Sequence, residues 1–154
     1  MANKSKLILS ESRVYVALDN IKRKIIKNFN EAGCTKEYAN QIIDHLIDSD
    51  LSGVESHGVV RTLQYLDEYQ QGYLLPNVVP KVTKDSLTKI NIDGQGGLGI
   101  PALNVATEEG IAAAKLNGMC AVAIRNTGHT GRLGAFAEKA ANQGCLFILM
   151  WWRS

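Results

Sequence analysis

The chain has 154 residues, of which 45% are hydrophobic and 21% are charged, an ordinary globular composition with enough chain for a buried core. Disordered, collagen-like and coiled-coil proteins are excluded by these values. Seventeen Lys and Arg residues against fifteen Asp and Glu residues leave a formal charge of +2, too small to indicate a nucleic-acid or membrane surface. The sequence has no apolar window long enough to cross a membrane and no apolar signal core, which predicts a cytoplasmic protein.

The cysteines and histidines do not form a recognisable metal or disulfide pattern. Cys34, Cys120 and Cys145 are odd in number, widely spaced and without a CxxC pair, which argues against a disulfide framework and a thiolate zinc site. The three histidines lack ligand spacing such as HExxH. We therefore expect no metal site.

The first part of the chain is predicted to be helical. Apolar residues recur every three or four positions over residues 12–32 and 35–50, with Thr35 as the N-cap of the second helix. Ser56 is expected to cap a third helix that runs to about residue 71. Two prolines then mark a crossover, so residues 1–80 are expected to form an N-terminal helical region and residues 81–154 a sheet-containing domain.

The second part alternates strands and helices. We expect a strand at 89–93, a tight glycine turn at 94–99, a helix at 102–117, a strand at 119–125 and a helix at 134–142. The apolar run at 145–152 is typical of a buried strand, which needs neighbours on both faces. The order predicts an α/β architecture, a mixed or parallel sheet covered by helices.

A first polar cluster occupies Ser56-His57-Gly58-Val59-Val60-Arg61. If Ser56 caps the helix, His57 and Arg61 lie one turn apart on one face. Imidazole titrates near neutrality and moves protons to and from hydroxyl or carbonyl oxygens, and the guanidinium fork matches a carboxylate. Together they suit a small 2-hydroxy or 2-keto acid.

A structural interpretation of the same residues stays open. In that interpretation His57 supports the helix start, and Arg61 pairs with a surface carboxylate such as Asp67 or Glu68. Tyr65 and Tyr69 continue the same helical stripe and are expected to pack rather than to take part in chemistry.

A second cluster lies at residues 125–132, after a predicted strand and before a helix, where α/β proteins place ligand loops. His129 stands between glycines that let the backbone approach a ligand closely. Arg125 and Arg132 supply positive charge for a phosphate or carboxylate. The alternative is an ordinary polar loop with one exposed histidine.

The glycines between the two clusters match a dinucleotide fingerprint. Gly94, Gly96 and Gly99 give GxGxxG after a strand and before a helix, but the acidic residue expected about twenty positions later is missing and Arg125 stands near that place. We therefore interpret the glycines first as a tight turn. A small Rossmann-type NADP reductase remains the alternative.

Taken in order, these motifs resemble the malate/L-lactate dehydrogenase family, the non-Rossmann group that includes ureidoglycolate, sulfolactate and diketogulonate oxidoreductases. The resemblance rests on the SHGxxR motif of Ser56–Arg61, on Asp93-Gly94 with Gly97 and Gly99, and on the NTGHTGRLG segment that begins at Asn126. It covers about residues 12–148.

The resemblance implies an NAD- or NADP-dependent oxidoreductase that moves a hydride between nicotinamide and the carbon of a 2-hydroxy acid, usually as a homodimer. It implies a largely antiparallel, non-Rossmann sheet. Ser56 and His57 then belong to the substrate pocket, Arg61 binds the carboxylate, and His57 or His129 transfers the proton. His129 and Gly131 would also lie near the cofactor.

Members of this family are considerably longer than 154 residues, and their main cofactor loops follow the strand that corresponds to 145–152. We therefore expect an incomplete cofactor domain that is inactive on its own. Arg132 indicates one branch of the family and leaves the substrate open. A non-catalytic interaction domain is the remaining alternative.

Overall fold

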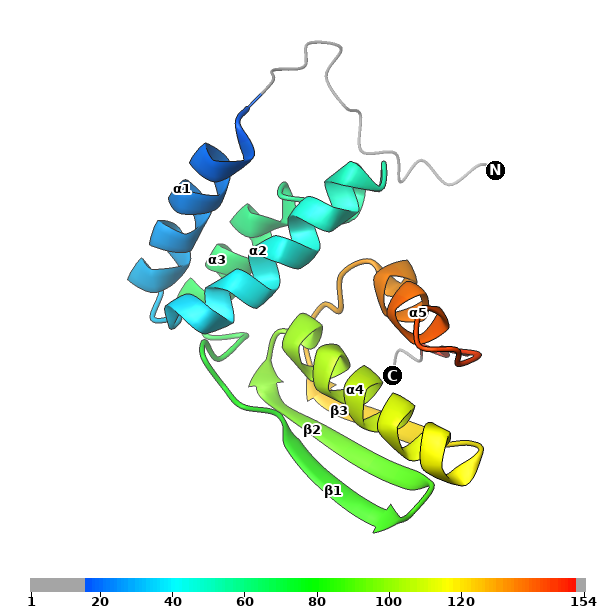
Figure 1. Cartoon of the computed structure of the whole chain (residues 1–154). Coiled ribbons are helices and arrows are strands. Elements are labelled where there is room, and N and C mark those ends of the chain that lie inside the picture. The colour runs from blue at the N-terminus through cyan, green and yellow to red at the C-terminus, as the bar shows by residue number, and fades with distance from the viewer. Residues whose placement is uncertain (1–15, 152–154) are drawn as a thin grey trace, which may run out of the picture.

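A computed structural model describes residues 16–151, and its first part is a group of three helices (Figure 1). Helix α1 spans Leu18–Glu31 and buries Ile25 and Phe29. Helix α2 spans Lys36–Leu51, and Thr35 caps it as predicted, because the Tyr38 N–H donates to the Thr35 hydroxyl over 3.3 Å. The beginning of the predicted helix, residues 12–15, lies outside the described residues.

The prediction of a helix from Ser56 to about residue 71 is wrong about where the helix starts. Ser56 lies within a single 3-10 turn, η1, at Glu55–His57, and helix α3 spans Arg61–Gln70. Gly58 separates the two, with an extended backbone that ends the turn. Ser56 is therefore not the cap of α3, and the SHGxxR motif is a turn followed by a helix start.

A three-stranded mixed sheet follows, in the order β1-β2-β3. Strand β1 (Lys81–Ser86) pairs antiparallel with β2 (Lys89–Gly97), and β3 (Ala121–Thr127) pairs parallel with β2. The sequence analysis missed β1, an edge strand in which only Val82 is partly buried, so it has no apolar alternation to detect. In the described residues the sheet thus has one antiparallel and one parallel pairing.

One long helix, α4 (Gly99–Asn117), lies across one face of this sheet and connects β2 to β3 (Figure 1). Helix α5 (Leu133–Ala141) packs against α4. Ile90 and Ile92 of β2 point to the helices and are fully buried, as the alternation of 89–93 predicted.

The predicted tight turn at 94–99 is mostly strand. Strand β2 continues to Gly97 through a register shift after Asp93, and α4 begins at Gly99 rather than 102. Gln95 and Gly96 have positive φ values of 55° and 75° within that irregularity. The Asp93 carboxylate accepts from the Gln95 N–H over 2.9 Å and from the Asn126 amide over 3.0 Å, which fixes the bulge against β3.

The apolar run predicted as a buried strand is not part of the sheet in the residues described, which end at 151. Phe147 and Leu149 pack against the sheet-side core, whereas Leu146 and Met150 are more than 90% exposed. The alternation is that of a strand with one covered face. The prediction of burial on both faces is therefore wrong for this segment.

The core consists of two clusters that meet at the start of α4. One cluster lies among α1, α2 and α3 and includes Leu98 and Ile100, and the other lies between the sheet, α4 and α5 and includes Ala102 and Phe136. The first turn of α4 thus belongs to both. The expected boundary at residues 80/81 stays a prediction.

Candidate active site

The SHGxxR turn is held in place by the end of α2. The Asp50 carboxylate accepts from the Val59 N–H over 2.9 Å, and a Cβ on Gly58 would lie only 1.7 Å from Asp50 Oδ1. Burial raises the pKa of Asp50, while the Val59 hydrogen bond lowers it. The sequence analysis gave Asp50 no role, because nothing in the local sequence connects it to the motif that follows.

Arg61 lies at the start of α3 with its guanidinium partly committed. Its Nε donates to the Ser56 carbonyl over 2.7 Å and its Nη1 to Gln64 Oε1 over 2.5 Å. Gln64 in turn donates to Glu68 over 2.8 Å. Within the described residues Arg61 makes no ion pair, so the structural interpretation that paired it with Asp67 or Glu68 is wrong.

The loop after β3 brings His129 to the same place. Gly128 N–H donates to the Gly97 carbonyl over 2.8 Å, and the His129 carbonyl accepts from the Gly99 N–H over 3.0 Å. The loop therefore lies across the end of β2 and the start of α4. This contact carries His129 to the helical side of the molecule, next to η1 and α3.

His57 and His129 meet although 72 positions separate them in the sequence. Their ring centroids are 5.3 Å apart at an angle of 33°. His57 Nδ1 lies 3.0 Å from the Ser56 hydroxyl, and His129 Nδ1 lies 2.7 Å from the Tyr65 hydroxyl. Four of the residues singled out in the sequence, Ser56, His57, Arg61 and His129, are thus brought together.

Both imidazoles are held neutral by their surroundings. Burial, and then the Arg61 charge, lower the pKa of His57. Burial, Arg61 and the two other histidines lower the pKa of His129 to about 4. A positive guanidinium next to two neutral, partly buried imidazoles leaves a site that favours an anion with an oxygen able to share a proton.

Arg132 does not belong to this site. Its guanidinium donates to Asp48 over 2.6 Å and to Glu138 over 2.7 and 3.1 Å, and its N–H donates to His45 Nε2 over 2.8 Å. His45 stacks on Phe136, with ring centroids 5.1 Å apart. The expected role of Arg132 in binding a phosphate or carboxylate is therefore replaced by one in fastening the loop to α2 and α5.

The comparisons with known proteins identify the family of the chain. Residues 16–152 match the family model described as malate/L-lactate dehydrogenase. The chain belongs to the malate/L-lactate dehydrogenase family. It is 34% identical over 120 residues to hydroxycarboxylate dehydrogenase B of Escherichia coli O157:H7, covering 78% of this chain and 33% of that protein. It is 36% identical over 130 residues to L-sulfolactate dehydrogenase of Methanocaldococcus jannaschii, covering 84% of this chain and 38% of that protein.

A solved structure of a family member shows the same fold. Malate dehydrogenase from Pyrococcus horikoshii superposes with a TM-score of 0.81 at 32% identity, covering 90% of this chain and 40% of that one. The chain thus spans between a third and two fifths of the length of these relatives.

The glycines at 94–99 of this chain are explained by close packing rather than by phosphate binding. A Cβ on Gly99 would lie 2.6 Å from the Gly128 carbonyl oxygen and 2.6 Å from Thr130 Cγ2. The N–H of Gly99, the first residue of α4, already donates to the His129 carbonyl. A dinucleotide diphosphate needs such N–H groups free at the helix start. The close packing and the bonded N–H of Gly99 therefore argue against a Rossmann site at the GxGxxG match.

Arg125 also has a structural partner. Its guanidinium lies 3.3 Å from Asp93 Oδ2 across the β2–β3 pair, and the side chain is 78% exposed. Such an exposed pair contributes little to stability. Arg125 is therefore exposed to solvent on the sheet. Within the described residues it forms no hydrogen bond or ring contact with the histidines.

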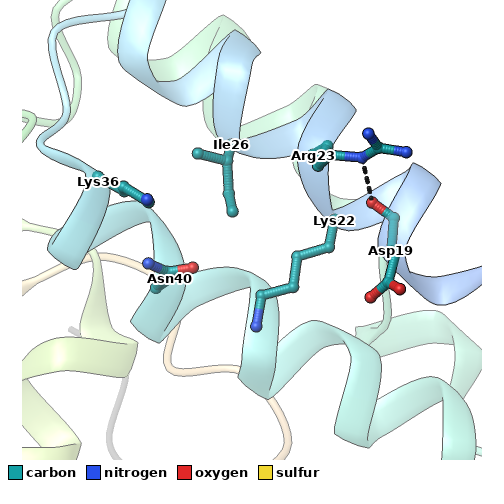
Figure 2. Close-up of a pocket in the computed structure, with 6 residues that line it drawn as sticks. All are labelled: Asp19, Lys22, Arg23, Ile26, Lys36 and Asn40. Atoms are coloured by element: carbon teal, nitrogen blue, oxygen red, sulfur yellow. Dashed lines mark hydrogen bonds between the residues drawn. The ribbon is translucent and has the colours of Figure 1, made fainter.

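A hollow of about 520 Å³ lies apart from this site, between α1 and α2. Figure 2 shows Lys22 reaching from α1 toward α2, where it donates to Asp44 over 2.6 Å. Arg23 donates to the Asp19 carbonyl and to Asn20. The basic residues of α1 therefore line a solvated groove between two helices. The lining residues are Asp19, Lys22, Arg23, Ile26, Lys36 and Asn40.

Over residues 16–151, no group of three or more His, Cys, Asp and Glu side chains is placed to hold a metal ion. Over the same residues, no helix has the length and apolar character needed to span a membrane.

Proposed function

We propose that this chain provides the acid-binding and proton-transfer part of an NAD- or NADP-dependent dehydrogenase that interconverts 2-hydroxy and 2-keto acids. The observation that carries the proposal is the meeting of Arg61, His57 and His129 from distant segments in one partly buried site. Family membership supports the same reaction class, because the relatives compared above are named dehydrogenases of hydroxycarboxylates, sulfolactate and malate.

Arg61 binds the substrate carboxylate in this proposal. Two of its three nitrogens, Nε and Nη1, donate to the Ser56 carbonyl and to Gln64, which fixes the plane of the guanidinium. Among the described residues Nη2 has no hydrogen-bond partner, and it remains for the ligand. A fork fixed in this way is preorganised for a carboxylate, which lowers the cost of ordering it on binding.

The two histidines divide the chemistry at the substrate C2 oxygen. His129, with a pKa near 4, stays neutral at physiological pH and donates a hydrogen bond to that oxygen. His57 contacts the Ser56 hydroxyl, and burial and the Arg61 charge lower its pKa, so we assign this neutral imidazole the proton that leaves or joins the oxygen. Ser56 orients His57.

The described residues fit the acid better than the dinucleotide. The Gly99 N–H is bonded to the loop and Arg132 is bonded to two carboxylates, so neither is free for a diphosphate. Gly131, expected near the cofactor, is buried against His45, and only its neighbour His129 borders the acid site. We propose that most of the NAD or NADP site comes from parts of the family fold beyond the described residues. The homodimer and the cytoplasmic location remain predictions.

The test is a titration of this chain with oxamate, an unreactive isostere of a 2-keto acid, followed by calorimetry or by NMR. We expect oxamate to bind the wild type, and Arg61→Met to weaken binding about 10- to 100-fold, the loss of a charge-assisted hydrogen bond. Arg61→Lys is the matched control, because it keeps the charge and loses the fork, and should fall between the two.

Equal binding by the wild type and Arg61→Met would contradict the carboxylate role, and no binding by the wild type would favour a non-catalytic interaction domain. A second measurement follows oxidation of NADH or NADPH with a panel of 2-keto acids. We expect no turnover by the 154-residue chain, and strong turnover would contradict the placement of the cofactor site outside the described residues.

A further inference from the structure

We infer that Tyr65 is a positioning residue that fixes the ring proton of His129 on Nε2. The sequence analysis expected Tyr65 to pack, and its ring is indeed fully buried in the helical core. Its hydroxyl, however, reaches the edge of that core and lies 2.7 Å from His129 Nδ1. A buried tyrosine hydroxyl needs a hydrogen-bond partner, and among the described residues this imidazole nitrogen is that partner.

The tautomer follows from a second contact on the same nitrogen. The Gly131 N–H donates to His129 Nδ1 over 3.2 Å. A backbone N–H can only donate, so this contact favours an Nδ1 that presents its lone pair and carries no proton. The neutral ring then holds its proton on Nε2, and the Tyr65 hydroxyl, at the shorter distance of 2.7 Å, is the stronger of the two donors that share the Nδ1 lone pair.

The loop geometry keeps this arrangement in place. Gly131 has a φ of 72°, and a Cβ there would lie 2.2 Å from His45 Nε2. The next N–H, of Arg132, donates to the same His45 nitrogen over 2.8 Å. The Gly131 N–H is thus directed at His129 by a backbone that is itself fastened to α2, while Tyr65 approaches from α3.

The electrostatic surroundings favour the neutral ring on which the tautomer depends. The charged and titratable groups that face His129 are His57 from η1, Arg61 and Tyr65 from α3, and His45 from α2. Burial and the Arg61 charge both oppose protonation of His129. The Tyr65 pKa is itself raised by burial, so its hydroxyl keeps its proton to donate.

The consequence for catalysis rests on the proposed function. A neutral His129 with its proton on Nε2 offers a fixed N–H donor to the C2 oxygen of the acid, and Tyr65 ensures that Nε2 rather than Nδ1 is the donor. The tautomer itself does not depend on that function. It is a property of the chain that holds with no ligand present, and it is measured separately.

The experiment is long-range proton–nitrogen NMR on the ¹⁵N-labelled chain, with His129→Gln to identify the His129 signals. We expect Nδ1 of His129 to resonate as an unprotonated, pyridine-type nitrogen and Nε2 as a protonated one. Tyr65→Phe removes one donor to the neutral ring, so we expect some Nδ1–H tautomer and a rise in the His129 pKa of about 0.5 to 1 unit, equivalent to one neutral hydrogen bond.

Tyr69→Phe is the matched control. Tyr69 is also buried on α3, but its hydroxyl faces Tyr38 and Cys34 rather than the histidines, so its removal should leave the His129 tautomer and pKa unchanged. A protonated Nδ1 in the wild type would overturn the inference whether or not the variants fold. An unchanged tautomer and pKa in a folded Tyr65→Phe would overturn it as well.

The two proposals fail separately. A fixed Nε2–H tautomer without oxamate binding would retain the role of Tyr65 in setting the ring and contradict only the proposed function. Oxamate binding with a protonated Nδ1 would contradict only the role of Tyr65.

Discussion

Gly99→Ala tests whether the glycine run serves packing. Gly99 begins α4 directly beneath the histidine loop, and a Cβ there would lie 2.6 Å from the Gly128 oxygen, 2.6 Å from Thr130 Cγ2 and 2.8 Å from the His129 oxygen. Two of these atoms are backbone and cannot rotate away. The loop must shift, and the hydrogen bond from the Gly99 N–H to His129 is lost or stretched.

The expected cost follows from these contacts. Overpacking of a tight site costs about 1–3 kcal/mol, and the hydrogen bond contributes about 1 kcal/mol. Part of this is offset, because alanine restricts the unfolded chain by about 0.4–1 kcal/mol relative to glycine. We expect the free energy of unfolding of Gly99→Ala to fall by about 2–3 kcal/mol, which lowers Tm by roughly 4–12 °C in a domain of this size.

Urea unfolding followed by circular dichroism measures this loss without any cofactor present. Gly110→Ala is the matched control within α4, because its Cβ meets only Val122 at 3.2 Å and gains helix propensity, so it should stay within about 1 kcal/mol of the wild type. Gly99→Ala with wild-type stability would refute the packing argument. A dinucleotide-binding glycine would instead show normal stability and lost NADP binding.

Three further predictions concern pH, the chain end and the loop anchor. The pKa of His45 is about 4 in the folded chain and about 6.5 in the unfolded chain, so its contribution to stability is complete above pH 6.5 and is lost as the pH falls toward 4. We expect the free energy of unfolding to fall by about 2–3 kcal/mol between pH 7 and 4.5, and His129 adds to this loss in the same direction. Urea midpoints measured across this pH range test the prediction. Serine at Leu146, Ile148 and Met150 together should reduce self-association in sedimentation velocity at nearly constant stability, because all three are exposed. Arg132→Met should lower stability by about 1–3 kcal/mol in urea unfolding, since the loop loses its anchor to α2 and α5.

The controls for these predictions use neighbouring residues. Phe147→Ser, which removes a side chain packed on the sheet-side core, should destabilise the chain where the serine replacements at the exposed positions do not. A flat stability curve between pH 7 and 4.5 would contradict burial of a neutral His45. Unchanged sedimentation after the triple replacement would show that the exposed row does not drive association.

The first two helices and the two polar clusters, at residues 56–61 and 125–132, could be predicted from the sequence because their signals are local. Apolar spacing identified α1 and α2, and the N-cap signal placed the start of α2 at Thr35. The residues of the candidate site were identified from the two motifs that contain them. What local sequence could not supply is the contact between His57 and His129, which depends on a loop lying across the start of α4.

The errors have physical reasons of the same kind. Serine is a residue type that commonly caps helices, but at Ser56 the chain turns at Gly58, next to the Asp50 carboxylate, before α3 begins. Arg132 has the charge of a ligand residue, but Asp48 and Glu138 come from elements that only the fold brings to it. Tyr65 fits an apolar stripe, and only its hydroxyl distinguishes it from a core residue.

The candidate site therefore depends on a network that does not itself touch the expected substrate. His129 is carried by a loop whose two ends are fixed, one by Gly97 and Gly99 and the other by His45 through the Arg132 N–H. The same loop accepts a hydrogen bond from the Gly99 N–H, so this N–H at the start of α4 is unavailable to a diphosphate. The contact that positions His129 in the candidate site is thus the one that occupies the Gly99 N–H, so losses at Gly99 and at His129 should be coupled.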